Sequence, residues 1–256
     1  MLNALSFDLE DWHPGDGIVH TTDLLLNNLG TVKTTFFILG SVAEQHPKLV
    51  KAIHQAGHEI GVHGYAHRLV YEQTPSEFKE DLRRVISIVE DIIGDRVIGH
   101  RAPWFSITEK SLWALPILSE EGLKYDSSVF PTKTTLYGIP DSPRFAHQVS
   151  GLPGPFWEIP LTTVRLLGIN VPCAGGFYAR AQPYSFLRWA IRRVNEEGYP
   201  AVLYFHPWEL AGYLPKLSMT LRDRLVRSYN IGSTIKKFRR LLQDFAFASL
   251  QEVFNI

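Results

Sequence analysis

Residues 34–63 read TTFFILGSVAEQHPKLVKAIHQAGHEIGVH, and this stretch decides the expected fold. The run over 34–40 is rich in β-branched and aromatic residues and closes on a glycine, which predicts a buried strand. A helical pattern follows up to Gly57, and residues 58–63 predict another short strand. A strand, a helix and a strand in close succession indicate a parallel sheet with helical crossovers.

The same alternation continues on both sides of this unit. Ser41 with Glu44, and Thr74 with Pro75, have the spacing of helix starts. Strands are also expected in 2–9, 97–101, 156–161, 163–171, 201–205 and up to 126, and helices in 20–29, 41–56, 74–94, 107–122, 183–198 and most of 220–247. Residues 131–156 are rich in Pro, Gly, Ser and Thr, which predicts a long surface loop, usually a functional or disordered one. The sequence therefore predicts an α/β fold, open or closed into a barrel, in a single domain over residues 1–256.

Composition excludes several classes of partner. The 256 residues carry 26 basic and 26 acidic side chains, and this balance argues against nucleic acid or an anionic membrane as partner. Cys173 is the one cysteine, which excludes an internal disulfide and fits a reducing compartment. The first residues lack a basic region, so no signal peptide is expected, and no apolar run approaches the roughly 18 residues of a transmembrane helix. We expect a cytoplasmic enzyme.

Polar side chains gather where the predicted strands end. In parallel α/β folds, ligands bind at the carboxyl ends of the strands. The groups at these ends are Asp8/Glu10/Asp11, His63/His67, His100/Arg101, Asp126 and His206. Acid, imidazole and guanidinium groups at five strand ends indicate one shared site.

His63 and His67 are the first candidate metal ligands. If the turn after His63 is helical, two imidazoles four residues apart share one face and can hold one ion. With ten histidines in the chain, such a pair also arises by chance. His58 lies where the strand is still buried, and we expect it to be structural.

Asp8, Glu10 and Asp11 form the second candidate. Their carboxylates repel one another unless a cation or an arginine neutralises them, and a solvated acidic turn is the alternative. Asp8 and Glu10 lie on the same face of the strand because side chains alternate along it. A carboxylate base beside a metal-binding carboxylate fits this geometry.

His206 and Arg101 complete the set. His206 follows a buried strand and is braced by Pro207 and Trp208, which suits a general acid, although a capped core histidine is the alternative. Arg101 could orient a carboxylate through its fork of donors, or form a plain surface salt bridge.

Taken together, these segments resemble the polysaccharide deacetylases of carbohydrate esterase family 4, the NodB-homology fold. Within that family they look most like the branch associated with bacterial exopolysaccharide loci. The matching segments, in chain order, are 6–12, 34–37, 57–67, 101–106, 125–128, 158–160, 175–178 and 206–209. Their combined order makes the resemblance specific.

The resemblance implies a distorted (β/α) barrel of about seven strands, with residues 211–256 as a C-terminal helical extension. It implies one divalent ion, of the zinc type, held by one carboxylate and two histidines, with His63 and His67 in the histidine roles. The implied reaction removes N-acetyl groups from a polysaccharide or oligosaccharide during exopolysaccharide biosynthesis.

The family roles transfer onto matching positions. Asp8 would be the catalytic base, held by Arg101, and the Trp104 backbone N–H would contribute to an oxyanion hole. His206 would be the general acid, with Asp126 tuning it. The residues expected to contact substrate are Trp12, Asp126 and Trp208.

One motif departs from the family pattern. The family has two adjacent aspartates, of which the second binds the metal, whereas Leu9 follows Asp8 here. We favour Glu10 as the ligand because it shares the face of Asp8, with Asp11 as the alternative.

Two rival functions remain. One is an allantoinase-like amidohydrolase acting on a small cyclic amide or ureide. The other is a catalytically silent carbohydrate-binding protein, which the retention of Asp8, Arg101 and His206 argues against.

Overall fold

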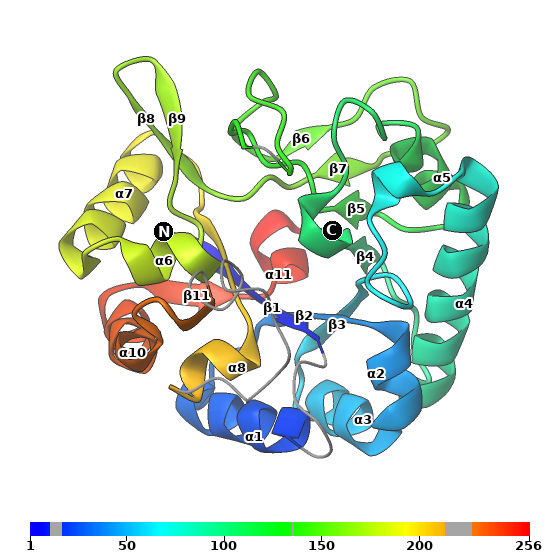
Figure 1. Cartoon of the computed structure of the whole chain (residues 1–256), viewed down its shortest axis with the longest axis horizontal. Helices are drawn as coiled ribbons and strands as arrows, with labels where there is room; N and C mark the ends of the chain where they lie inside the picture. The colour runs from blue at the N-terminus through cyan, green and yellow to red at the C-terminus, as the bar shows by residue number, and fades with distance from the viewer. Residues whose placement is uncertain (11–16, 135, 213–226) are drawn as a thin grey trace.

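The computed structural model describes residues 1–10, 17–134, 136–212 and 227–256, and its centre is a curled sheet (Figure 1). Seven strands follow one parallel path across this sheet. In spatial order they are β10 (Val202–Phe205), β1 (Leu2–Leu9), β2 (Thr35–Ile38), β3 (Glu59–Val62), β4 (Gly99–His100), β5 (Tyr125–Asp126) and β7 (Trp157–Glu158). The predicted α/β fold is confirmed.

Four more strands complete the described β-structure. β6 (His147–Gln148) pairs antiparallel with β7 at one edge, and β11 (Ala246–Ala248) pairs parallel with the start of β1. β8 (Thr163–Leu166) and β9 (Ile169–Pro172) form a separate hairpin. The predicted strand over 163–171 is therefore two strands, because Leu167 and Gly168 both have positive φ and turn the chain back.

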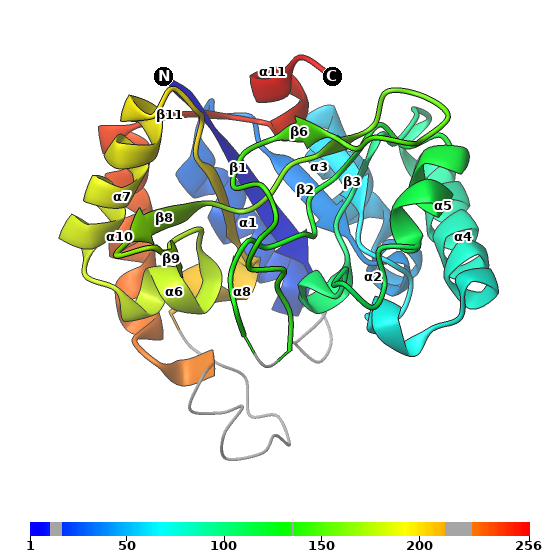
Figure 2. The same cartoon turned by 90° about the horizontal axis from the view of Figure 1, so that it is seen from above.

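Helices lie around the outside of the sheet (Figures 1 and 2). The α-helices are α1 (Gly17–Leu29), α2 (Gly40–Gln45), α3 (Pro47–Gln55), α4 (Pro75–Ile93), α5 (Ala114–Glu120), α6 (Gly176–Ala181), α7 (Tyr184–Glu196), α8 (Pro207–Leu210), α10 (Thr234–Asp244) and α11 (Leu250–Phe254). Short 3-10 turns are η1 (Val70–Glu72), η2 (Pro103–Phe105) and η3 (Ile231–Ser233). None of the described helices has the length and apolar character needed to cross a membrane.

Side-chain alternation in β1 separates the core from the site. Leu5, Phe7 and Leu9 pack in the main hydrophobic cluster, to which the helices also contribute. Ser6 and Asp8 are also buried, and they alternate with these apolar residues along the strand. Successive side chains of a strand point to opposite faces of the sheet. The apolar side chains therefore face the helices, and the polar ones point inward, away from the helices.

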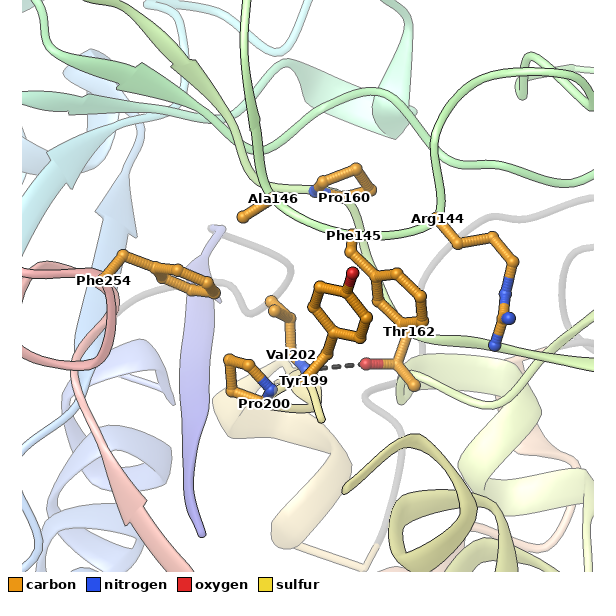
Figure 3. A pocket seen from close by; sticks show the side chains of 9 residues that line it. All are labelled: Arg144, Phe145, Ala146, Pro160, Thr162, Tyr199, Pro200, Val202 and Phe254. Atoms are coloured by element: carbon orange, nitrogen blue, oxygen red, sulfur yellow. Dashed lines mark hydrogen bonds between the residues drawn. The ribbon is translucent and has the colours of Figure 1, made fainter. Parts of the chain in front are cut away.

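The sheet curls until its two edges approach each other. Between β7 and β10, the Thr162 N–H donates to Val202 O at 3.2 Å, and the Val202 N–H donates to Thr162 Oγ1 at 2.6 Å. Figure 3 shows this seam, where the Phe145 and Tyr199 rings stack with centroids 3.7 Å apart. The cavity here holds only about 20 Å³, which is room for about one water. At this seam, the segment after β7 contacts β10 through single hydrogen bonds rather than through a regular strand pairing.

The prediction of a single helix over 41–56 is wrong, because the chain forms two helices, α2 and α3, with a break at His46. Pro47 has no N–H to donate, so it is suited to the first position of a new helix. Glu44 does not cap α2, which follows Leu39; its carboxylate accepts a hydrogen bond from Tyr65 Oη at 2.7 Å.

Two other helices are shorter than predicted. α5 begins at Ala114 rather than 107, because the Ser111 hydroxyl accepts from the Thr108 N–H and donates to Ser106 O, which favours a turn. The helix predicted in the tail is α10, over Thr234–Asp244, and the predicted part up to residue 226 lies outside the described residues.

The helix start predicted at Thr74 is confirmed. Its hydroxyl accepts from the Glu77 N–H at 3.3 Å, and the Glu77 carboxylate accepts from the Thr74 N–H at 2.8 Å. This reciprocal pair satisfies two backbone donors at the start of α4.

We therefore expect Thr74→Ala to lower the free energy of unfolding by about 1 kcal/mol, measured by urea denaturation. Ser76→Ala, at an exposed position of the same turn, is the control and should change it by under roughly 0.5 kcal/mol. Equal effects of the two changes would contradict a capping role for Thr74.

Candidate active site

The strand ends bring most of the predicted side chains to one end of the sheet. Figure 2 shows β1 running from the end where both chain termini lie towards the opposite end, and the site is there. A cavity of about 440 Å³ opens at this end. Its described lining comprises Asp8, Glu10, Trp104, Phe105, Leu136, Tyr137, Phe177, Arg180, Tyr204, His206, Trp208, Glu209 and Arg227.

Glu10, His63 and His67 converge on one point. Glu10 Oε1 lies 3.2 Å from His63 Nε2 and 2.8 Å from His67 Nε2, and the three ligand atoms lie within 4.8 Å of one another. His63 Nδ1 lies 2.7 Å from Arg101 O, and a carbonyl can only accept, so this nitrogen carries the proton. The other ring nitrogen, Nε2, is therefore the one turned towards the Glu10 carboxylate. Two imidazoles and one carboxylate are the donor set of catalytic zinc and of related divalent ions, so the residues fit a metal.

The turn that joins the two histidines is not helical, so this part of the prediction is wrong. Gly64 and His67 have φ values of 72° and 57°, and the Tyr65 N–H donates to Asp81 Oδ2 at 2.9 Å. These left-handed residues reverse the chain after β3. The reversal leaves the His63 and His67 ring centroids 5.5 Å apart.

Glu10 is the carboxylate that meets the histidines, whereas Asp11 lies outside the described residues. Burial alone would raise the pKa of Glu10, but the imidazoles of His206 and His67 outweigh it and hold that pKa well below its usual value. The Glu10 side chain therefore stays ionised at neutral pH.

Arg101 is fully buried, which is incompatible with a surface salt bridge. Its Nη1 donates to Asp8 Oδ1 at 2.8 Å and to Ser6 Oγ at 2.7 Å. Nη2 and Nε donate to the hydroxyl and the carbonyl of Ser127, and the guanidinium lies 4.3 Å over the Phe37 ring. With this set of partners, Arg101 holds Asp8 in one orientation.

His206 lies directly after β10, with Nε2 3.7 Å from Glu10 Oε1. Its Nδ1 lies 2.9 Å from Oε2 of the buried Glu209, whose Oε1 is 2.7 Å from Arg180 Nε. Burial would lower the pKa of His206, but Glu10 and Glu209 outweigh it and raise that pKa to about 10. The sequence analysis missed Glu209, although its position three residues after His206 is the capping-box spacing.

Asp126 contacts His100 rather than His206, and its assignment as a tuning and substrate-binding residue stays a prediction that these contacts do not support. Its Oδ1 lies 2.6 Å from His100 Nδ1, and it accepts from the Ser128 hydroxyl at 2.7 Å. The side chain is fully buried. Because Ser128 Oγ also accepts from the Ala102 N–H at 2.6 Å, Asp126 supports the segment that follows Arg101.

Trp104 lines the cavity from an unusual turn. Trp104 and Phe105 have φ values of 55° and 52°, a left-handed conformation that costs energy for bulky residues. The Phe105 ring packs edge-on against Phe130, Tyr137 and Tyr204, which stabilises this turn. The hydrogen bonds that close the turn are donated by the N–H groups of residues 105 and 106, not by that of residue 104.

Of the two tryptophans predicted to contact substrate, the structure describes one. Trp208 lines the cavity and its ring stacks on His206 at 5.4 Å, whereas Trp12 lies outside the described residues. Leu136 and Tyr137 come from the predicted long loop, whose composition was the signal for function. Phe177 lies in the matching segment 175–178, whereas Arg227 carried no local signal, because only packing brings its segment to the cavity.

His58, expected to be structural, is buried and accepts from the Thr34 N–H at 3.2 Å. Burial and the nearby Lys33 lower the pKa of His58 to about 4, so the ring is neutral. It lies before β3, at the end of that strand remote from the cavity.

Comparisons with known proteins found relatives in sequence and neighbours in fold. Peptidoglycan deacetylase-like protein FGM2 of Gibberella zeae is 32% identical over 114 residues, which are 44% of this chain and 33% of that protein. The chain spans about a third of the length of the first curated relatives it matches. Among solved structures, Puue allantoinase superposes with a TM-score of 0.67 at 15% identity, covering 98% of this chain and 88% of that one. A family 4 carbohydrate esterase from Streptomyces lividans gives 0.54 at 17% identity, covering 97% and 91%.

Two family models divide the sequence between them. The model described as polysaccharide deacetylase matches residues 4–124, which include Glu10, His63, His67 and Arg101. The model described as domain of unknown function (DUF3473) matches residues 127–255, which include His206 and Glu209. The DUF3473 model covers half of the chain, so the chain belongs to that family, and the first half of the chain matches the polysaccharide deacetylase model.

Proposed function

We propose that this chain is a metal-dependent hydrolase that removes N-acetyl groups from an N-acetylated polysaccharide or oligosaccharide. The observation that carries the proposal is the meeting of three metal-ligand atoms with Asp8 and His206 in one cavity. An amide hydrolase needs a base, an acid and a stabiliser of the developing oxyanion, and these groups supply all three.

Glu10, His63 and His67 would hold one divalent ion, most simply zinc. Three protein ligands leave positions open for water and substrate, as catalytic zinc sites require. An ion bound there polarises the acetamide carbonyl and lowers the pKa of water. Arg101 supports the ligand set as well, since its carbonyl fixes the His63 tautomer.

The protein's own side chains would carry the protons. Asp8 takes a proton from the attacking water, and its ion pair with Arg101 holds the carboxylate in place. The Trp104 N–H donates to the substrate oxygen as negative charge develops there. His206 then protonates the leaving amine, with Glu209 on its other nitrogen holding the ring.

The aromatic lining favours a sugar substrate, because flat rings pack on the apolar faces of pyranoses. Trp104, Tyr137, Phe177 and Trp208 supply such rings around the cavity. The sequence resemblance supports a role in exopolysaccharide biosynthesis.

We also propose that residues 1–256 form one domain, with 211–256 as an extension packed on it. β11 pairs with β1, and α10 contacts both α7 and α8, which supports this arrangement over the described part of the extension.

The direct test of function is acetate release by the wild-type protein from a partly acetylated oligosaccharide, after loading with zinc. We expect turnover of this substrate and none of allantoin. Turnover of allantoin alone would favour the ureide hydrolase, and sugar binding without any acetate release would favour the silent binding protein.

The metal assignment predicts that Glu10→Gln, His63→Ala and His67→Ala each lose bound zinc, measured by elemental analysis after dialysis. Asp11→Asn should keep a full equivalent, because the cluster is complete with Glu10. His20→Ala, at an exposed position in α1, is the control for losing a histidine elsewhere. Zinc loss in Asp11→Asn with retention in Glu10→Gln would transfer the ligand role to Asp11.

The base assignment predicts that Asp8→Asn keeps its zinc but lowers kcat by about 10²- to 10⁴-fold, the usual contribution of a general base. The amide preserves the size of the side chain, so KM should change little. Unchanged kcat in the folded, zinc-loaded variant would remove Asp8 from the mechanism.

A further inference from the structure

Lys237, in helix α10, is placed to hold the end of another helix, α6. Its Nζ donates to the carbonyl oxygens of Ala179, Arg180 and Gln182 at 3.0, 2.8 and 2.6 Å. Burial lowers the pKa of Lys237, but three acceptors match the three protons of an ammonium group. A cation is also favourable at a helix C-terminus, where the unpaired carbonyls carry partial negative charge.

α6 connects this contact to the candidate general acid. Arg180 lies in the last turn of α6, and its buried guanidinium is 2.7 Å from Glu209 Oε1. The other oxygen of Glu209 is 2.9 Å from His206 Nδ1. A displacement of α6 would therefore reach the imidazole through two contacts.

The segment before α10 fixes the same arginine from another side. Arg180 Nη1 donates to the carbonyl oxygens of Arg227 and Tyr229, and the Asn230 side chain donates to Arg180 O at 2.8 Å. Asn230 has a φ of 54°, which turns the chain so that this contact forms. The region over 227–237 thus surrounds both the backbone and the side chain of Arg180.

We propose that Lys237 is a positioning residue for proton delivery, holding α6 so that Arg180 and Glu209 fix the His206 imidazole for protonation of the leaving amine. This inference rests on the proposed function. It assigns the second half of the chain a part in the reaction beyond supplying His206 itself, because Lys237 does not line the cavity.

The chemistry of the leaving group provides a selective test. A sugar amine is a poor leaving group and needs a proton, whereas the phenolate of an aryl acetate leaves without one. Loss of acid positioning should therefore slow amide hydrolysis and spare aryl ester hydrolysis. Damage to the metal centre, to Asp8 or to the whole fold would slow both reactions.

We expect Lys237→Met to lower kcat for deacetylation of the oligosaccharide by about tenfold or more, as a misplaced catalytic group does. Hydrolysis of 4-nitrophenyl acetate, KM for the oligosaccharide and zinc content should stay close to wild type, because none of them depends on proton delivery to the leaving amine. Lys237→Arg, which keeps a cationic donor, should recover most of the rate. Lys236→Met, at the exposed neighbouring position, is the matched control and should resemble wild type.

A second variant covers the case in which Lys237→Met fails to fold. Asn230→Gly keeps the positive φ but removes the side-chain donor to Arg180 O, so a smaller loss with the same substrate selectivity is expected. Equal losses on amide and ester, or no loss on either in a folded variant, would overturn the positioning role.

A spectroscopic measurement separates this inference from the proposed function. In wild type, the His206 Nδ1 proton hydrogen-bonded to Glu209 should give a downfield signal in ¹⁵N-edited NMR, and Lys237→Met should shift or broaden it while Lys236→Met does not. If wild type releases no acetate from the oligosaccharide, the proposed function fails, and this signal still decides whether Lys237 positions His206. An unchanged signal in Lys237→Met would refute the inference even if wild type is an active deacetylase.

Discussion

The ion pair between Arg101 and Asp8 is the contact on which the site depends. Both side chains are almost completely removed from water, and every donor nitrogen of Arg101 has a partner, either on β1 or at Ser127 after β5. A buried charge without its partner costs several kcal/mol, so neither side chain can leave the arrangement alone. The pair joins β1 to the end of β4, and the Arg101 carbonyl extends the connection to His63. Base and metal ligands are therefore held by one residue.

The parallel strands bring these charged side chains together at one end of the sheet. Because all seven parallel strands end on the same side, side chains that are far apart in the sequence meet there without any long excursion of the backbone. Along β1, inward-pointing polar residues alternate with apolar residues that pack towards the helices. Asp8 therefore faces the site, while its neighbours on the other face of the strand belong to the core. The site thus lies at the edge of the hydrophobic core, which explains how its carboxylates can be buried and still be held in fixed orientations.

The acid side of the cavity is built differently from the metal side. His206 is supported by Glu209 from its own turn, but Glu209 relies on Arg180, and Arg180 relies on α10 and the segment before it. Each charge in this series is next to an opposite charge or a set of carbonyl groups, as burial requires. One family model ends at residue 124 and the other begins at residue 127, yet residues from both ranges line the same cavity.

The sequence alone determined the α/β fold and the positions of Asp8, Glu10, His63, Arg101 and His206 at strand ends, because alternation and apolar runs are local patterns that show where strands stop. It did not determine which carboxylate meets His206, because Asp126 at the end of β5 was as plausible as Glu209 three residues after His206. Only packing directs Asp126 to His100. The left-handed turn at His67 and the break at Pro47 also escaped the local patterns. The contact of Lys237 with α6 joins residues more than fifty positions apart, and distances of that kind are decided by tertiary structure.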